Sequence, residues 1–430
     1  MQAIILSIGD ELVLGQTVDT NSAYLSQRLA ERGISTRYHQ TVADDQAAIA
    51  DVITHASRMV PLILITGGLG PTEDDLTRQA MSDAMAAPLV LDEQQLATIK
   101  TMMTRGGRRM PDRNRIQAMH PRGTDMISNT CGTAPGIFAK LNKASIYVMP
   151  GVPREMLAMF ARDVEPELDA FNPDRHVILT AKVNTFGQGE SSIAESLGDL
   201  MARSRNPKVG TTAGQGIVAV RVRSEFADAG EAQLSLDDTM GQVRDRLGAI
   251  VFGVEDETLQ QTLVNLLRDK GATVATAESC TGGLVGKMIS DISGSSSVYA
   301  GGWVTYSNQM KHDQLGVRME LIDEHGAVSE PVARAMARGA LEHSGATLAT
   351  SITGVAGPTG GSEEKPVGTV WIAVAEQRAA ADPEVQTMLF QLPGERDTVR
   401  DRAARCALQM LRFMLLDQSL DDMAWGKRGT

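Results

Sequence analysis

The sequence predicts an α/β protein with two or three domains. Over residues 1–66, short apolar runs alternate with stretches of helical periodicity, which is typical of a parallel, doubly wound sheet. A glycine-rich turn follows the third apolar run, at residues 67–75. In the second half, a β-branched run at residues 273–276 leads into a glycine-opened helix. Ligands in open α/β sheets bind at the carboxyl ends of strands, so both loops are candidate sites.

The elements of the first domain are assigned from their end signals. Thr20 or Asn21 can cap a helix that ends at Gly33, Asp44 can cap the next helix, and a third helix starts near Asp75. For each of these aspartates taken alone, helix capping is the simplest role. The strands are expected at residues 3–8, 35–42 and 62–66.

The sequence pattern in the middle of the chain predicts a small α+β module over residues 171–254. Its strands are expected at residues 177–183 and 216–222, with a helix at 191–201. In the last domain, a strand at residues 347–353 feeds a glycine turn from Gly354 to Gly361, whose backbone donors can bind a phosphate.

A long helix is predicted at residues 396–415, followed by a loose tail at 418–430. The apolar face of this helix is interpreted as core or as a dimer seam. It is formed by Val399, Ala403, Ala407, Leu408, Leu411 and Met414.

Composition narrows the class of protein. The 430 residues are 42% hydrophobic, enough for two or three cores, and the net charge of −12 argues against extended contact with a nucleic-acid backbone. Cys131, Cys280 and Cys406 lie far apart, which predicts neither a disulfide framework nor a zinc cluster. The N-terminus reads as a strand, and no apolar run approaches membrane-spanning length. We therefore expect a cytoplasmic protein without a membrane partner.

The stretch from Ala277 to Gly283 places Ser279 between a predicted strand and a predicted helix. The first N–H groups of a helix have no internal partners and can stabilise an oxyanion or a phosphate. A serine hydroxyl is a poor nucleophile without a base. The alternative is that Ser279 and Thr281 only cap the helix.

Lys311 is the candidate base for Ser279. Residues 303–306 predict a strand and Asn308 an N-cap, so Lys311 falls in the first helical turn, where the macrodipole disfavours positive charge. Burial against Tyr306 would lower the pKa of Lys311 further and give the neutral amine that Ser–Lys hydrolases require. The alternative is a solvated surface lysine. Cys280 could compete as nucleophile, although a small apolar filler is its commoner role.

The glycine turn at residues 67–75 is a candidate phosphate site. Bare glycine backbone at Gly67, Gly68 and Gly70 lets phosphate oxygens approach N–H groups closely. The spacing matches neither G-x-G-x-x-G nor a Walker loop.

Three aspartates at neighbouring strand ends could hold a hard divalent cation over a diphosphate. They are Asp44, Asp74 and Asp75.

Motifs in both halves, in the same order, resemble those of CinA proteins. The N-terminal set resembles the CinA domain that is similar to the molybdopterin-binding fold, and the C-terminal set resembles the nicotinamide-nucleotide amidase (PncC) domain. The N-terminal motifs lie at residues 9–15, 19–21, 67–75, 129–136 and 150–156. The C-terminal motifs lie at residues 277–283, 305–311, 326–331, 353–358 and 363–370.

The resemblance covers nearly the whole chain. It implies a molybdopterin-binding-like domain at residues 1–170, a KH-like module at 171–254 and an amidase domain at 255–417. It implies hydrolysis of ADP-ribose by the first domain with Mg²⁺, Mn²⁺ or Co²⁺, and deamidation of nicotinamide mononucleotide by the last domain without a cofactor. In the first domain a lysine is expected where Ile116 stands.

The resemblance also implies residue roles. Ser279, Lys311 and Tyr306 are expected to be catalytic, and Asp44, Asp74 and Asp75 to bind the metal. The expected substrate-binding residues are Thr281, Gly282, Gly283, Thr353, Gly354, Gly357 and Arg400 in the last domain, and Gly67, Gly68, Gly70, Thr72, Asn21 and Glu155 in the first.

The expected partners are the two small nucleotides and a second copy of the chain in a homodimer. Direct nucleic-acid binding is not expected, because the middle module has no basic G-x-x-G clamp. Two alternatives remain. Hydrolysis of ADP-ribose is the main activity, or the chain is a non-catalytic scaffold in DNA uptake that binds a recombination protein.

Overall fold

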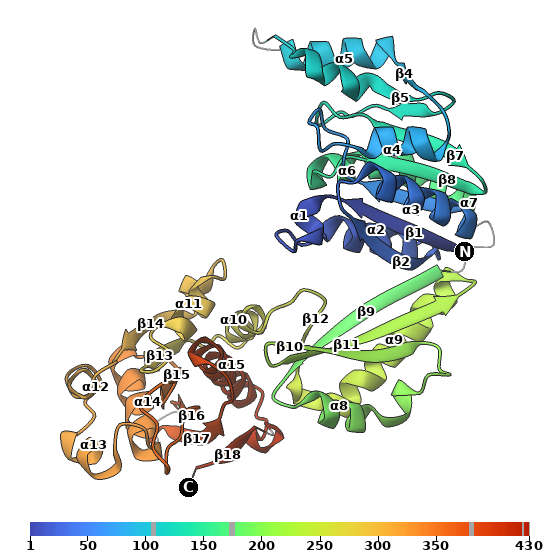
Figure 1. Cartoon of the computed structure of the whole chain (residues 1–430). Coiled ribbons are helices and arrows are strands. Elements are labelled where there is room, and N and C mark those ends of the chain that lie inside the picture. Colours follow the sequence, from blue (N-terminus) through green and yellow to red (C-terminus); the bar gives the residue numbers. More distant parts are fainter. Residues whose placement is uncertain (105–108, 172–176, 378–381, 424, 430) are drawn as a thin grey trace. The chain divides into compact units, whose positions relative to one another are not determined.

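The computed structural model describes residues 1–104, 109–171, 177–377, 382–423 and 425–429 (Figure 1). They form two compact units, Met1–Leu179 with Ser224–Leu234, and Thr180–Arg223 with Ser235–Thr430. The boundaries between the two units fall at residues 179/180, 223/224 and 234/235, which all lie within the middle module. Each unit is described by itself.

The first unit is built on a six-stranded sheet of order β2-β1-β3-β8-β7-β6. Strands β2, β1, β3 and β8 are parallel, whereas β7 and β6 run antiparallel. The α/β prediction is therefore confirmed, with a mixed sheet in place of a wholly parallel one. The strands are β1 (Gln2–Ile8), β2 (Ser35–Val42), β3 (Leu62–Thr66), β6 (Asp125–Ile127), β7 (Gly136–Leu141) and β8 (Ala144–Met149), with β4 (Leu89–Leu91) and β5 (Met119–Pro121) in a separate pair.

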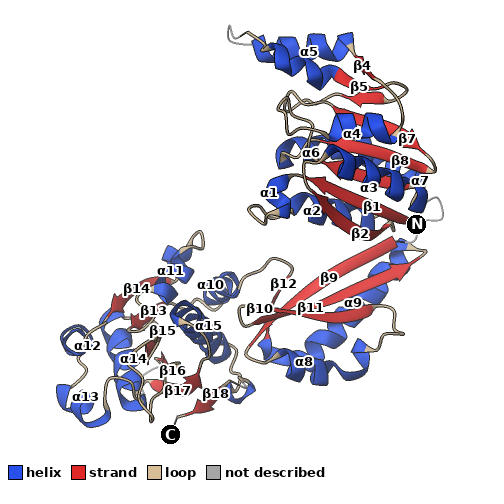
Figure 2. Ribbon diagram, viewed as in Figure 1, coloured by secondary structure: helices blue, strands red, loops and turns tan. Residues whose placement is uncertain are grey.

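Helices cover both faces of this sheet (Figure 2). Helices α3 and α4 pack on one face and α2 and α6 on the other. The helices are α1 (Asp10–Val13), α2 (Thr20–Ala30), α3 (Gln46–Met59), α4 (Thr77–Ala84), α5 (Glu93–Thr104), α6 (Pro153–Met159) and α7 (Leu168–Phe171).

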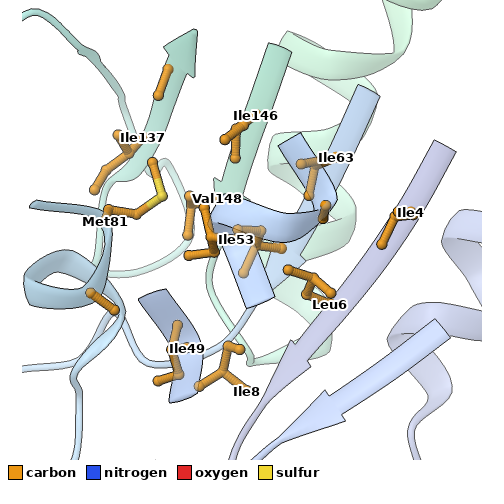
Figure 3. Packing of buried hydrophobic residues seen from close by; sticks show 14 of the residues in the cluster. Ile4, Leu6, Ile8, Ile49, Ile53, Ile63, Met81, Ile137, Ile146 and Val148 are labelled. Carbon is orange, nitrogen blue, oxygen red and sulfur yellow. The ribbon is translucent and has the colours of Figure 1, made fainter. Parts of the chain in front are cut away.

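Strand β1 shows why the sheet is buried on both faces. Successive side chains of a strand point to opposite faces. Ile4 and Leu6 pack with Ile49 and Ile53 of α3 (Figure 3). Ala3 and Ile5 join the core on the opposite face. The continuous apolar run at residues 3–8 is thus a strand between two helix layers, as predicted.

Three predicted helix caps of the first unit are displaced. Asp19, not Thr20 or Asn21, caps α2 by accepting from Ser22 N. Asp45, not Asp44, caps α3 by accepting from Ala48 N. Helix α4 begins at Thr77 after Leu76, so Asp75 is not its cap. Both Asp44 and Asp75 are thereby free for other contacts.

The middle module has a four-stranded sheet of order β10-β11-β9-β12. It matches the predicted α+β character, with both predicted strands extended by a few residues. Its elements are β9 (Val177–Phe186), α8 (Glu190–Leu197), β10 (Lys208–Gly214), β11 (Ile217–Phe226), α9 (Ala229–Leu247) and β12 (Val251–Val254).

The last domain is built on a second six-stranded sheet, of order β14-β13-β15-β16-β17-β18. Strands β14, β13 and β15 are parallel, so their carboxyl ends meet at one edge, and the remaining strands are antiparallel. The strands are β13 (Val274–Glu278), β14 (Tyr299–Val304), β15 (Leu348–Gly354), β16 (Thr369–Glu376), β17 (Glu384–Gln391) and β18 (Gly426–Arg428).

Helix α14 contacts β13, β15, β16 and β17, and α15 contacts β15 and β16 together with α10 and α11. The helices are α10 (Leu259–Asp269), α11 (Leu284–Ser290), α12 (Asn308–Leu315), α13 (Met319–His325), α14 (Glu330–Ser344) and α15 (Arg396–Leu415).

The C-terminal end decides between two alternatives and corrects one expectation. The six apolar residues of α15 are buried within one copy of the chain, which confirms the first alternative, core, for this face. The described residues of the tail, 418–423 and 425–429, are not loose as predicted: β18 pairs with β17, and Leu420 and Met423 are each 1% exposed. None of the helices in the described part of the chain is long and apolar enough to cross a membrane.

Candidate functional sites

Ser279 lies directly after β13, at the carboxyl end of that strand. Its N–H donates to Ile352 O at 2.9 Å, and its carbonyl accepts from Gly282 N at 3.1 Å. Helix α11 starts only at Leu284, and its N-cap is Gly283, whose φ of 92° favours glycine. The alternative that Ser279 or Thr281 caps this helix is therefore wrong.

Glu278 takes the capping role that the sequence assigned to its neighbours. Its side chain is 1% exposed, and its carboxylate accepts from Val285 N at 3.0 Å and Gly286 N at 2.8 Å. These N–H groups are the first ones of α11 that we expected to face a substrate oxyanion. The buried carboxylate already satisfies them, so oxyanion donors must come from elsewhere in the site.

Lys311 lies beside Ser279. Its Nζ is 3.0 Å from Ser279 Oγ and 2.9 Å from the carbonyl oxygen of Thr305, and the residue is only 1% exposed. Burial lowers the pKa of Lys311. Among the described residues, the hydrogen-bond partners of its Nζ are Ser279 and Thr305, and neither is an acid. A lysine buried without an acidic partner is held toward its neutral form, because desolvation disfavours the charged one.

The cap of the helix that carries Lys311 differs from the prediction. Ser307, not Asn308, caps α12 by accepting from Met310 N. Tyr306 is 60% exposed, and its hydroxyl accepts from Arg396 at 2.9 Å. That Tyr306 contributes to the burial of Lys311 stays a prediction.

A cavity of about 310 Å³ opens onto this pair. Tyr306, Thr353, Gly354 and Gly357 line it, as the resemblance implied. Four other expected binding residues do not line it. These are Thr281, Gly282, Gly283 and Arg400.

Three of the residues that do not line the cavity have structural roles at the turn after Ser279. They are Arg400, Gly282 and Gly283. Arg400 donates to Thr281 O at 2.8 Å, and this hydrogen bond stabilises the turn. Gly282 and Gly283 have φ values of 60° and 92°, which explains their identity by backbone conformation and not by ligand contact.

Arg396 is the cavity residue that the sequence reasoning missed. It lines the cavity and donates to Gly357 O at 2.6 Å as well as to the Tyr306 hydroxyl. It precedes Arg400 by one helical turn at the start of α15. The sequence around Arg396 and Arg400 does not distinguish them, because they are one turn apart on the same helix. Which of the two lines the cavity depends on where α15 begins relative to the cavity.

Cys280 also lines the cavity, but it is a weak rival of Ser279. Burial raises the pKa of the Cys280 thiol to about 12. The thiolate is the reactive form of cysteine, so this residue is almost entirely unreactive at neutral pH.

The first unit carries a second, larger cavity of about 560 Å³. It lies where the parallel strands β1, β2, β3 and β8 end. Of the residues expected here, only Thr72 does not line it. Those that do are Asn21, Asp44, Gly67, Gly68, Gly70, Asp74, Asp75 and Glu155.

Asp75 shapes the glycine loop of this cavity. Its carboxylate accepts from Gly70 N at 2.6 Å and Thr72 N at 2.9 Å, and from the Thr72 hydroxyl. A Cβ on Gly68 would lie 2.1 Å from Thr77 Oγ1, so only glycine fits at that position. Asp75 and the glycines therefore set the conformation of the loop, and Asp75 has little capacity left for a metal.

Asp44 belongs to an acidic group at the mouth of the cavity. Asp44 and Asp10 exchange hydrogen bonds, with Asp10 N donating to Asp44 Oδ2 at 2.9 Å and Asp44 N donating to Asp10 Oδ1 at 3.1 Å. Burial, and then the charges of Asp10, Glu11 and Asp74, raise the pKa of Asp44. Within the described ranges, no three His, Cys, Asp or Glu side chains form a ready metal site. The predicted set of three aspartate ligands is not assembled.

The fold and the two cavities define a three-part α/β protein with a polar site at the carboxyl ends of parallel strands in each outer domain. The three parts match, in order, a probable molybdopterin binding domain over residues 4–170, the damage-inducible protein CinA KH domain over 180–253 and the CinA C-terminal domain over 256–415. The chain belongs to the CinA family of competence/damage-inducible proteins.

Full-length relatives share this organisation. A putative competence-damage inducible protein of Symbiobacterium thermophilum is 43% identical over 97% of this chain and 99% of its own length. A CinA-like protein of Gemmatimonas aurantiaca is 38% identical over 100% of both chains. The crystal structure of the competence/damage inducible protein CihA from Agrobacterium tumefaciens is 41% identical and covers 37% of this chain and 94% of its own, with a TM-score of 0.35.

Replacing Glu278 tests its capping role. In Glu278→Gln the amide group would set a donor against the N–H of Val285 or Gly286. We expect a loss of about 1–3 kcal/mol in the free energy of unfolding, measured with denaturant, because a buried donor is left unsatisfied. Glu342→Gln, on the exposed side of α14, is the matched control and should change stability by less than about 0.5 kcal/mol. Equal effects of the two substitutions would contradict the capping role.

Proposed function

We propose that the last domain is a nicotinamide mononucleotide deamidase that uses Ser279 as nucleophile and Lys311 as base. The observation that carries this proposal is the 3.0 Å contact between Lys311 Nζ and Ser279 Oγ inside a buried pocket. A neutral amine donates one N–H to Thr305 O and can direct its lone pair at the serine hydroxyl. This is the arrangement that Ser–Lys hydrolases require.

The reaction proceeds in two halves. Ser279 Oγ, giving its proton to Lys311, attacks the carboxamide carbon, and the tetrahedral intermediate collapses to an ester as ammonia leaves with a proton from Lys311. Water, deprotonated by the same lysine, then hydrolyses the ester to the carboxylate. The N–H of Cys280, the residue after the nucleophile, and the amides of the turn at residues 354–361 are the candidate oxyanion donors.

The substrate class fits the charges at the cavity. The lining contains two basic residues among the described ones: the buried Lys311, which acts as a neutral amine, and the exposed Arg396, which remains to meet an anionic group. The amide group must reach Ser279, so the phosphate of a nicotinamide nucleotide would lie toward Arg396. Tyr306 is held by Arg396 and would orient the substrate or relay protons.

Removing either member of the pair should abolish deamidation. We expect Ser279→Ala and Lys311→Ala to lower kcat/KM for ammonia release from nicotinamide mononucleotide by a factor of at least about 10³. Cys280→Ala should be nearly silent, since the thiol is buried and protonated. Lys287→Ala, which removes an exposed lysine of α11, is the matched control for Lys311. Full activity in either Ser279→Ala or Lys311→Ala would contradict the mechanism.

The pH dependence follows from the lowered pKa of Lys311. The reactive form is the neutral amine, so kcat/KM should rise with pH through this pKa and level off below the value of about 10.4 for a free lysine. Between the two pKa values the unfolded chain binds more protons than the folded one, so the free energy of unfolding should rise with pH in the same window. A kcat/KM profile that falls as pH rises through the neutral range would exclude Lys311 as the base.

For the first domain we propose metal-dependent hydrolysis of ADP-ribose as a second activity. The observation that favours it is the combination of a glycine loop and acidic residues around one large cavity. Mg²⁺ is commonly held by one or two carboxylates together with substrate phosphates, so the lack of a three-carboxylate cage among the described residues fits such a metal. Asp44 and Asp74 would hold the cation, which would neutralise charge on the diphosphate.

A chelator separates the two activities. Excess EDTA should abolish AMP formation from ADP-ribose and leave ammonia release from nicotinamide mononucleotide unchanged. Asp44→Asn should likewise lower only the first rate, because it removes one expected metal ligand. AMP formation that persists in EDTA would refute the metal-dependent mechanism. The absence of turnover with both nucleotides would favour the scaffold role in DNA uptake.

A further inference from the structure

Arg78 is a charged residue in the interior of the first unit. It is 0% exposed and among the largest fully buried side chains of the described residues. Burial lowers its pKa to about 10, so it still carries its charge at neutral pH. Its guanidinium donates to Leu69 O and to Gly70 O, the latter at 3.1 Å, and its Nε has no partner among the described residues.

Among the residues that the structure describes, no carboxylate is bonded to the guanidinium. Asp75 lies near enough to favour its charge, but the carboxylate of Asp75 is occupied by Gly70 N, Thr72 N and the Thr72 hydroxyl. A buried cation without a bonded anion is costly for a protein. Such a residue indicates that an anion is supplied at another stage, for example by a ligand.

Arg78 and its neighbour Thr77 hold four consecutive carbonyl groups of the glycine loop. Gly67 O accepts from Thr77 Oγ1 at 2.9 Å, and Gly68 O accepts from Thr77 N at 3.2 Å. The next two carbonyls, of Leu69 and Gly70, accept from Arg78. All four carbonyls therefore point toward the start of α4.

This arrangement turns the loop amides toward the cavity. In a trans peptide the C=O and the following N–H point in opposite directions. The N–H groups of Gly68 and Leu69 must therefore point away from α4, and both residues line the cavity. Neither N–H has an acceptor among the residues that the structure describes. Successive free N–H groups in a glycine loop form an anion-binding concavity.

Among the described residues that line the cavity there is no lysine or arginine, although there are several acidic side chains. We propose that Arg78 is a positioning residue of the first domain that directs the loop amides at a diphosphate group and supplies, across the loop, the positive charge that this group needs. The inference rests on the proposed pyrophosphatase function and assigns a role that the cavity-lining residues do not provide.

Binding of inorganic pyrophosphate in the presence of Mg²⁺ tests this role on the full chain, by titration calorimetry at two salt concentrations. Arg78→Gln keeps a hydrogen-bond donor for the loop but removes the charge, and should weaken binding about tenfold and flatten its salt dependence. Arg78→Lys keeps the charge and should remain within about threefold of the original chain. Arg58→Gln, which removes an exposed arginine of α3, should bind unchanged and serves as the matched control.

The outcomes separate the two proposals. If the original chain binds no pyrophosphate and forms no AMP from ADP-ribose, both the pyrophosphatase function and the role of Arg78 fail. If the original chain binds and a folded Arg78→Gln variant binds equally well, only the role of Arg78 is overturned. Should Arg78→Gln not fold, Arg78→Lys decides: affinity like that of the original chain supports the role of the charge, and loss of binding overturns it. Ammonia release from nicotinamide mononucleotide reports that the other unit is intact in each variant.

Discussion

The contact between Lys311 and Ser279 is the interaction on which the chemistry proposed for the last domain depends. A lysine at this distance activates a serine only if it is neutral, and a lysine is neutral near physiological pH only if burial outweighs its hydration. Three parallel strands make this possible, because β13, β14 and β15 end at the same edge of the sheet. Ser279 follows the first, Thr305 and then helix α12 with Lys311 follow the second, and the glycine turn follows the third.

Three charged side chains make contacts around Ser279 and Lys311. The N–H groups of Val285 and Gly286 in the first turn of α11 are bonded to Glu278, which ties the start of this helix to the end of β13. Arg400 donates to the carbonyl of Thr281 in the turn. Arg396, one helical turn earlier, lines the cavity and donates to Gly357 O. A pre-organised site of this kind spends little binding energy on ordering itself, which is the general basis of electrostatic catalysis.

The cavity of the first unit differs from that of the last domain in the charge of its lining. It also lies where parallel strands end, but its lining is acidic, and a diphosphate carries negative charge. Backbone N–H groups turned outward by buried side chains and a cation held between carboxylate and phosphate would both reduce the repulsion. The two proposed sites therefore differ in their electrostatics. A desolvated amine lies in one cavity, and several carboxylates line the other.

The sequence by itself determined the elements and the chemistry-bearing loops. The strands at residues 35–42 and 62–66 and the helix at 396–415 were predicted with the observed bounds, because periodicity and end signals are local. Ser279 and Lys311 were singled out by the same signals and by family likeness. Only the tertiary structure decided that Glu278 caps α11, that Arg396 rather than Arg400 lines the cavity, and that Arg78 lies beneath the glycine loop. Those facts depend on burial and on contacts between residues distant in the chain, and neither is encoded in a short stretch of sequence.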